Sequence, residues 1–270
     1  MQLYADLRLL TARPGPEELA AAPHHLFGIA DAACAWSTGA WLRAAGGLVN
    51  DLVAQGRACI LVGGTGLYFQ ALTGGLAEIP PIAAEIRAEA SRDYEALGEE
   101  AFRARLGRVD PASALRIYPK DRLRLSRAWE VFLQTGRSIS DWQAHTPTPE
   151  LPAPVTRIAL EPPREVLYAR CDRRLVEMCD LGVLEEVAAL AARGLDPALP
   201  LMKAVGFREF AAHLRGELSL SRALDLAQME TRRYAKRQLT WLRRQMGDWP
   251  RLTGEDAETQ WGQFLALNAP

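Results

Sequence analysis

The sequence predicts an α/β protein whose parallel sheet is interrupted by a helical insertion, and two observations lead to this prediction. Early in the chain, a helical pattern is followed by the short apolar run Ala58–Val62 and then by a second helical pattern. This order of elements is typical of a parallel α/β sheet. Between residues 83 and 145, in contrast, only helical patterns occur. We therefore expect residues 1–81 and 146–270 to form the α/β core, and residues 82–145 to form the insertion.

Each element is predicted by a local pattern. Ser37 is suited to cap a helix that ends at Gly56, because the apolar residues between them recur at spacings of three and four. The apolar run Ala58–Val62 is then expected to be a buried strand, and residues 67–73 the next helix. The proline-rich residues 146–154 are expected to link the insertion back to the core.

The remaining elements are predicted in the same way. Within the insertion, the expected helices are residues 83–96, 98–107, 111–117, 121–135 and 138–144. After the linker, we expect strands at Val155–Leu160 and Arg251–Leu252, and helices at residues 164–181, 183–193, 203–215, 221–246 and 256–267.

The composition is that of an ordinary globular protein. Apolar residues make up 49% and charged residues 24% of the 270 residues. No apolar run approaches the roughly 20 residues that a membrane span needs, and the first residues do not resemble a signal peptide. The four cysteines show no metal-binding spacing, which favours reduced core thiols. We therefore expect a cytoplasmic, monomeric protein without a membrane partner.

The chain carries two clusters of basic residues, although its net charge is only −1. Residues 230–251 carry seven arginine and lysine residues, offset only by Glu230 and Asp248, and Trp241 lies among them. The second cluster spans Lys120 to Arg127. Such clusters are usually solvated surfaces, but guanidinium groups interleaved with aromatic rings also suit RNA, which they bind by phosphate pairing and base stacking.

A glycine-rich turn, Gly63–Gly66, follows the expected strand. In one interpretation its glycines only permit close packing. In the other, Thr65 presents a hydroxyl and an N–H group at the carboxyl end of a central strand, where open α/β sheets bind ligands. The spacing matches neither a dinucleotide fingerprint nor a phosphate-binding loop.

Conventional catalytic machinery is not visible in the sequence. No serine lies in a nucleophile elbow, and the segment from Lys203 to Arg208 is by itself weak evidence for a phosphate site. The histidines show neither metal-binding nor triad spacing; they are His24, His25, His145 and His213.

Taken in order, these segments resemble the tRNA dimethylallyltransferase family. The resemblance is carried by the stretches MQLYADLRLLTARP, PHHLFGIAD, WSTGAW, LVGGTGLYFQAL, DRLRLSRAWEV, GRSISDWQ, LMKAVGFREF and TRRYAKRQLTWLRRQ. Together they span nearly the whole chain. The ordered set is specific, whereas no single stretch would be sufficient.

The resemblance implies a P-loop NTPase-like parallel sheet with an inserted helical domain that contacts tRNA. It implies transfer of a dimethylallyl group from dimethylallyl diphosphate to N6 of the adenine on the 3′ side of the tRNA anticodon. In such enzymes the diphosphate lies in a P-loop with Mg²⁺, the adenine is flipped into a channel, and an aspartate removes the N6 proton. The implied partners are thus the anticodon stem-loop and the prenyl donor.

The resemblance also assigns roles to individual residues. Thr65 is expected at the wall of the channel where adenine and donor meet, and Arg232 is a diphosphate candidate on charge and position alone. No metal ligand is predicted. Residues expected to contact tRNA are Met1, Gln2, Arg87, Leu123, Arg124, Leu125, Ser126, Arg127, Lys203, Gly206, Arg208, Lys236, Arg237, Gln238, Trp241 and Arg243.

The sequence departs from the family pattern at its start. Family members carry a glycine-rich Gly-Lys-Ser/Thr loop and then a strand that ends in Asp-Ser, whereas Met1 matches the position directly after that Asp-Ser. The P-loop, the hydroxyl that holds Mg²⁺, the expected base and the first core strand are therefore not in this sequence, and Asp6 lies in a different motif position. We expect from this that the chain as written is inactive or nearly so.

Three interpretations stay open. We favour a prenyltransferase whose recorded start is too short, because the downstream motifs are intact. The second is a tRNA-binding remnant that transfers nothing. The third is a P-loop kinase relative that acts on a small molecule, against which the arginine-rich segment 236–244 argues.

Overall fold

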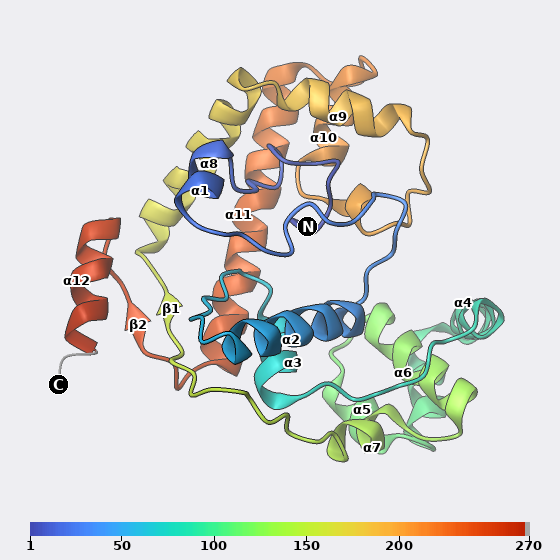
Figure 1. Ribbon diagram of the computed structural model, residues 1–270. Helices are drawn as coiled ribbons and strands as arrows, with labels where there is room; N and C mark the ends of the chain where they lie inside the picture. The colour runs from blue at the N-terminus through green and yellow to red at the C-terminus, as the bar shows by residue number, and fades with distance from the viewer. Residues whose placement is uncertain (268–270) are drawn as a thin grey trace. The chain divides into compact units, whose positions relative to one another are not determined.

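The computed structural model describes residues 1–267 and divides the chain into two compact units (Figure 1). Unit 1 consists of Met1–Gly66 and Pro152–Pro270, of which the described part ends at Leu267, and unit 2 consists of Leu67–Leu151. Both units are mainly helical. From the sequence we expected the insertion to begin after residue 81 and to end before residue 146. These limits stay a prediction.

Four helices build the core of unit 1: α8 (Arg164–Asp180), α9 (Val183–Ala192), α10 (Phe207–Leu214) and α11 (Leu220–Gln245). The long helix α11, orange in Figure 1, packs against α8 and α10, and α10 also packs against α9. The apolar sides of these helices recur at helical spacing, which is why they were predictable from the sequence. Their buried residues include Leu175, Met178, Val187, Leu190, Phe207, Phe210, Ala223 and Ala227.

The sheet of unit 1 is smaller than the sequence predicts. Strand β1 (Ala159–Leu160) pairs in parallel with β2 (Arg251–Leu252), and α12 (Ala257–Leu267) follows. A single parallel bridge joins Tyr4 to Ala30. The expected strand Val155–Leu160 is thus formed only at its last two residues, because β2 is itself two residues long and offers no further partner.

The prediction of a buried strand at Ala58–Val62 is wrong. These residues follow α2 (Thr38–Ala54) and are not part of any strand; the side chains of Ile60 and Val62 are 89% and 79% exposed. A short apolar run becomes a buried strand only where neighbouring strands supply hydrogen bonds and other elements cover it. Within residues 1–267 no strand lies beside this run. The helix before it is confirmed, because Ser37 Oγ accepts a hydrogen bond from Ala40 N at 3.1 Å.

The helix expected at residues 203–215 is divided. A 3₁₀ turn, η1 (Leu201–Lys203), precedes α10, and Gly206 between them has φ = +89°. This left-handed conformation cannot continue a helix. A short helix near the start, α1 (Pro16–Ala21), was not expected from the sequence.

Unit 2 confirms the helices that were predicted for the insertion, which are α4 (Ala84–Gly107), α5 (Pro111–Arg116), α6 (Arg122–Thr135) and α7 (Ile139–Ala144). The helix predicted at residues 67–73 of the core is also present, as α3 (Gly66–Gly74). Gly98 has φ = +69° and kinks α4 at the predicted break. The side chains of Asp110, Asp121 and Ser138 cap the N-termini of α5, α6 and α7, respectively. Such local capping residues predict where a helix begins.

The core of unit 2 is aromatic. Phe102 and Trp129 pack edge to face with ring centres 6.2 Å apart, and the Trp129 indole donates to Asp93 Oδ2 at 3.0 Å. Ala90, Leu106, Ile117, Leu125 and Ala128 complete this cluster. The cluster fixes α4 against α6, whose exposed sides carry most of the charges of the unit.

Asp110 is the main buried polar contact in unit 2. Its side chain is 1% exposed and accepts hydrogen bonds from Ser113 N at 2.9 Å and from Ser140 N at 3.2 Å. We expect Asp110→Ala to lower the free energy of unfolding by about 2–4 kcal/mol, since it removes a helix cap and leaves Ser140 N–H without its acceptor. The Asp121→Ala variant, which removes a half-buried cap, should cost only about 1 kcal/mol. Denaturant unfolding followed by circular dichroism compares them, and equal losses would contradict this account.

The contribution of Asp110 also depends on pH. Burial raises the pKa of this carboxyl, but hydrogen bonds from Ser113 and Ser140 outweigh burial and hold the pKa below its ordinary value. A lowered pKa in the folded state means that the stabilisation is present above the ordinary aspartate pKa, near 4, and is lost as the pH falls through the lowered value. The difference in the free energy of unfolding between wild type and Asp110→Ala should therefore be constant from pH 6 to pH 7 and shrink below pH 4. A difference that grows on acidification would contradict the lowered pKa of Asp110.

The cysteines and the membrane prediction can be compared with the structure. None of the four cysteines forms a disulfide within residues 1–267, and only Cys171 is buried; the expectation of core thiols is wrong for Cys34, which is exposed. In the described part of the chain, no helix has the length and apolar character required to cross a membrane.

Candidate functional site

The glycine turn and the basic helix α11, distant in the sequence, meet in unit 1. Gln238 Nε2 donates to Gly64 O at 2.8 Å. Gly66 lies so close to Trp241 that a Cβ atom at this position would be 2.0 Å from Trp241 Cζ3. Thr65, between the two glycines, is exposed. The glycines therefore do permit close packing. Their partners are Gln238 and Trp241, two residues that the resemblance predicts to contact tRNA.

The position of Thr65 requires a correction. The turn does not lie at the carboxyl end of a central strand, because the residues before it form no strand. Its backbone is held instead by α11. The role of Thr65 as a channel wall stays a proposal.

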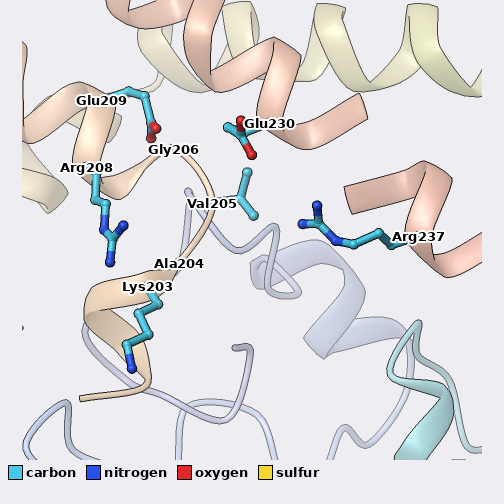
Figure 2. Close-up of a pocket in the computed structure, with 8 residues that line it drawn as sticks. All are labelled: Lys203, Ala204, Val205, Gly206, Arg208, Glu209, Glu230 and Arg237. Carbon is cyan, nitrogen blue, oxygen red and sulfur yellow. The ribbon is translucent and has the colours of Figure 1, made fainter. Parts of the chain in front are cut away.

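A cavity of about 530 Å³ opens beside the Gly206 turn in unit 1. Figure 2 shows Arg237 extending from α11 toward Val205, while Glu209 and Glu230 lie on the side of Gly206. Because Glu230 and Arg237 are seven residues apart on α11, they share one face of that helix. The residues around the cavity are Lys203, Ala204, Val205, Gly206, Arg208, Glu209, Glu230 and Arg237.

The cations of this cavity lack carboxylate partners. Within residues 1–267, Lys203 and Arg208 make no ion pair, and Arg237 contacts only the ring of Tyr234, with its guanidinium carbon 5.5 Å from the ring centre. Glu230 is bound by Arg233 at 2.6 Å and is therefore partly neutralised. Three cations around one cavity can hold phosphate oxygens without first breaking an ion pair.

Other arginines of the basic segment are already paired, which corrects the expectation that almost nothing offsets them. Arg243 Nη2 is 2.6 Å from Glu161 Oε1, and Arg233 is paired with Glu230. Glu230 was already counted in the sequence as an offsetting acid, whereas Glu161 lies in another part of the fold and was not expected. In the described chain, Lys236 and Arg244 make no ion pair.

Arg232, the diphosphate candidate, is held by α8. Its Nη1 atom donates to both carboxylate oxygens of Asp172, at 2.6 and 2.7 Å, and both side chains are about one-third exposed. Binding of a diphosphate by Arg232 would have to compete with this carboxylate. No local pattern predicts this pair, because the two residues are 60 positions apart.

The residues near the start of the chain have structural partners. Gln2 Nε2 donates to Ala12 O at 2.7 Å, and Met1 is half exposed. Asp6 is paired with Arg193 and accepts a hydrogen bond from Ala32 N at 2.9 Å. Asp6 is thus engaged in holding the loop, in agreement with its different motif position.

Two acidic contacts near this loop were missed by sequence reasoning. Glu186 on α9 accepts backbone N–H groups from three consecutive residues, Arg8, Leu9 and Leu10, at 2.6–2.9 Å. Arg193 also binds Asp31 at 2.8 Å, and this contact lowers the pKa of Asp31. Both contacts join segments more than 150 residues apart, for which no local pattern exists.

In unit 2, the predicted tRNA-contacting residues have very different surroundings. Arg87 is exposed and Leu123 is 82% exposed, but Leu125 is fully buried in the aromatic core, so its side chain cannot touch RNA; that prediction is wrong. Arg124 is 70% exposed and bound by Asp121 at 2.8 Å. Ser126 and Arg127 are half-buried, and Arg127 is paired with Glu130 at 3.6 Å.

The described residues do not fit a metal ion on their own. Within residues 1–267 no group of three or more histidine, cysteine, aspartate or glutamate side chains converges as a metal site would require. The described residues therefore supply no ligand set for the Mg²⁺ that the resemblance implies.

Comparison with known proteins places the chain among enzymes that modify tRNA. A family model described as IPP transferase matches residues 2–245. The tRNA dimethylallyltransferase of Phenylobacterium zucineum is 64% identical over 98% of this chain and 86% of its own length. That of a Caulobacter species is 54% identical over 93% of this chain and 82% of its own length.

Solved structures agree with the sequence comparison. The tRNA isopentenylpyrophosphate transferase of Bacillus halodurans is 30% identical, covers 99% of this chain and 84% of its own chain, and has a TM-score of 0.67. A eukaryotic dimethylallyltransferase that acts on tRNA has a TM-score of 0.81 at 23% identity, over 100% of this chain and 72% of its own, which shows a shared fold. Together, the family model and the identity over nearly the whole chain show that this protein belongs to the tRNA dimethylallyltransferase family.

Proposed function

We propose that this protein transfers a dimethylallyl group from dimethylallyl diphosphate to N6 of the adenine on the 3′ side of a tRNA anticodon. In this reaction a bond forms between N6 and the first carbon of the prenyl group, the carbon–oxygen bond to the diphosphate breaks, and the N6 proton leaves. The diphosphate takes the electron pair of the broken bond. The observation that carries the proposal is the contact of the Gly63–Gly66 turn with Gln238 and Trp241 of the basic helix.

The geometry suits an RNA substrate better than a small molecule. Exposed cations without carboxylate partners lie on α11 and around the cavity beside Gly206, and Trp241 adds an aromatic ring. Phosphates bind such cations, and an unpaired base stacks on such a ring. In this scheme α11 binds the RNA backbone, and the turn places Thr65 beside the flipped adenine. The P-loop type of the core is proposed on the likeness to solved isopentenyltransferases.

The expectation that the chain is inactive gains no support from these comparisons. They match 98% of this chain to an enzyme that carries the name of the activity, and they do not show the chain to be a truncated form.

A transfer assay tests the proposed function. The protein is incubated with dimethylallyl diphosphate and an anticodon stem-loop, and the nucleosides are analysed by mass spectrometry. We expect product only at the adenine beside the anticodon, and none when guanosine replaces it. Binding without transfer would favour the tRNA-binding alternative, and neither binding nor transfer would contradict the proposal.

The salt dependence of RNA binding tests the cavity. We expect Arg237→Gln to weaken binding of the stem-loop and to reduce the slope of log K against log salt by roughly 0.7–1, which is the effect of one lost phosphate contact. Arg222→Gln is the matched control, because Arg222 is an exposed arginine four turns away on the same helix. Equal slopes for Arg237→Gln and wild type would exclude Arg237 as a phosphate ligand.

A further inference from the structure

Tyr118 lies in the loop between α5 and α6 of unit 2, and its side chain is largely exposed. Its side chain is 65% exposed, and within the described residues it takes part in no hydrogen bond or ring contact. A tyrosine ordinarily buries its ring and exposes only the hydroxyl. An aromatic surface of this size is therefore available to a ligand.

The backbone around Tyr118 is held by two side chains of α4. The Arg103 guanidinium donates to Ile117 O at 2.6 Å and to Tyr118 O at 3.0 Å. Glu99 accepts the N–H of Lys120 with both oxygens, at 2.8 and 3.0 Å, and also binds Arg103 at 3.0 Å. The hydrogen bond from Lys120 and the Arg103 guanidinium lower the pKa of Glu99, so this carboxylate stays ionised. The backbone of the loop at Tyr118 is thus held in a defined conformation.

The loop also contains an unfavourable backbone conformation. Lys120 has φ = +66°, in the left-handed region that residues other than glycine rarely occupy. Such conformations persist only where the surrounding structure imposes them, and they gather at binding sites. Here the contacts of Glu99 and Arg103 impose the conformation, while Ile117 next to Tyr118 is anchored in the core.

The charges near this loop favour a polyanion. Arg116 and Lys120 make no ion pair in the described chain, and Arg124 is 70% exposed. The carboxylates of Glu99 and Asp121 are engaged with backbone N–H groups and arginines, so they offer little repulsion. An exposed ring among cations is suited to a nucleotide, with the base on the ring and the phosphate on a cation.

We propose that Tyr118 is a stacking platform for an unpaired base of the tRNA, with Lys120 beside that nucleotide's phosphate. The inference rests on the proposed function, because it takes the tRNA as the ligand. Within the sequence, Tyr118 lies only five residues before the exposed Leu123 of α6. The proposal therefore extends the surface expected to contact tRNA from α6 to the loop before it.

Binding measurements with two RNAs test this inference. The affinity of the full chain for an anticodon stem-loop, and for a duplex of the same stem without the loop, is measured for wild type, Tyr118→Ala, Tyr118→Phe and Leu115→Ala. Leu115 is the matched control, because it is exposed on α5 of the same unit. We expect Tyr118→Ala to weaken stem-loop binding by about 5- to 150-fold, the effect of losing one base–aromatic stack.

The other variants and the duplex show whether a change in affinity comes from loss of base stacking. Tyr118→Phe should keep near wild-type affinity, because the ring is retained, and Leu115→Ala should change little. The duplex affinity and the salt slope should be unchanged in Tyr118→Ala, since stacking involves no counterion release. Stem-loop affinity of Tyr118→Ala within twofold of wild type would overturn the inference and leave the proposed function intact. Failure of the wild type to bind the stem-loop would instead overturn the proposed function.

Discussion

Replacing Gly206 with alanine is expected to lower the free energy of unfolding by about 2–5 kcal/mol. Gly206 has φ = +89°, a conformation that costs an L-residue roughly 1–2 kcal/mol. A Cβ atom here would also lie 3.0 Å from Leu10 Cδ1 and 3.5 Å from Phe210 Cε2. The Phe210 distance is an ordinary contact, but Leu10 is buried and too close, so relief of this crowding costs about 1–3 kcal/mol more. Because Lys203 and Arg208 flank the turn, RNA binding should weaken as well.

Gly216 provides the matched control for this variant. It has φ = +77°, but a Cβ atom there would meet nothing within 4 Å. Gly216→Ala should therefore incur only the backbone cost, about 1–2 kcal/mol, and leave RNA binding unchanged. Chemical denaturation measures both variants. If Gly216→Ala is as unstable as Gly206→Ala, the close approach of Leu10 is not what requires glycine at position 206.

Replacing Gly66 with alanine is expected to lower the rate of dimethylallyl transfer by about 10²-fold. The new Cβ atom would lie 2.0 Å from Cζ3 of the Trp241 ring, so either the turn or the indole must move. Displacement of a substrate-positioning group by about 1 Å can cost a factor of this size. Because Thr65, the proposed channel wall, is adjacent, the displacement should act on the proposed site. The free energy of unfolding should change by less than the activation free energy of transfer does.

Gly64→Ala is the control for this substitution. A Cβ atom at Gly64 would also be too close to a side chain, 2.1 Å from Nε2 of Gln238, but this atom is the end of a flexible side chain that can swing away. We expect a loss of transfer of less than about tenfold, comparable to deleting the single hydrogen bond to Gly64 O. Initial rates at saturating donor compare the two. A larger effect of Gly64→Ala than of Gly66→Ala would contradict the role given to Trp241.

Local signals explain which parts of the fold were predictable. The helices of unit 2 begin at capping residues such as Asp121 and Ser138, and α4 is kinked at Gly98, so short segments of sequence were sufficient. The run Ala58–Val62 was not predictable in this way, because its burial depends on strands elsewhere. The division of residues 203–215 depends on the crowded turn at Gly206, which only the folded core creates.

The candidate site was predictable in part for the same reason. Composition identified the basic segment of α11, and the resemblance identified the glycine turn. The contact between Gln238 and Gly64 spans 174 positions and has no local signature. Helical periodicity could have warned that Leu125 faces the core, because Trp129 lies one turn further on the same face. The pairing of Arg232 with Asp172 required the packing of α8 on α11.

The most direct test of the proposed function is the modification state of tRNA in cells. The gene for this protein is disrupted in its own organism, and the nucleosides of the isolated tRNA are analysed by mass spectrometry. We predict that N6-dimethylallyl adenosine, with any nucleoside made from it, disappears beside the anticodon. It should return fully when the gene is restored, but only in part when the restored gene carries Gly66→Ala, because that variant is expected to retain slow transfer. Full modification of this adenine in the disrupted strain would contradict the assignment.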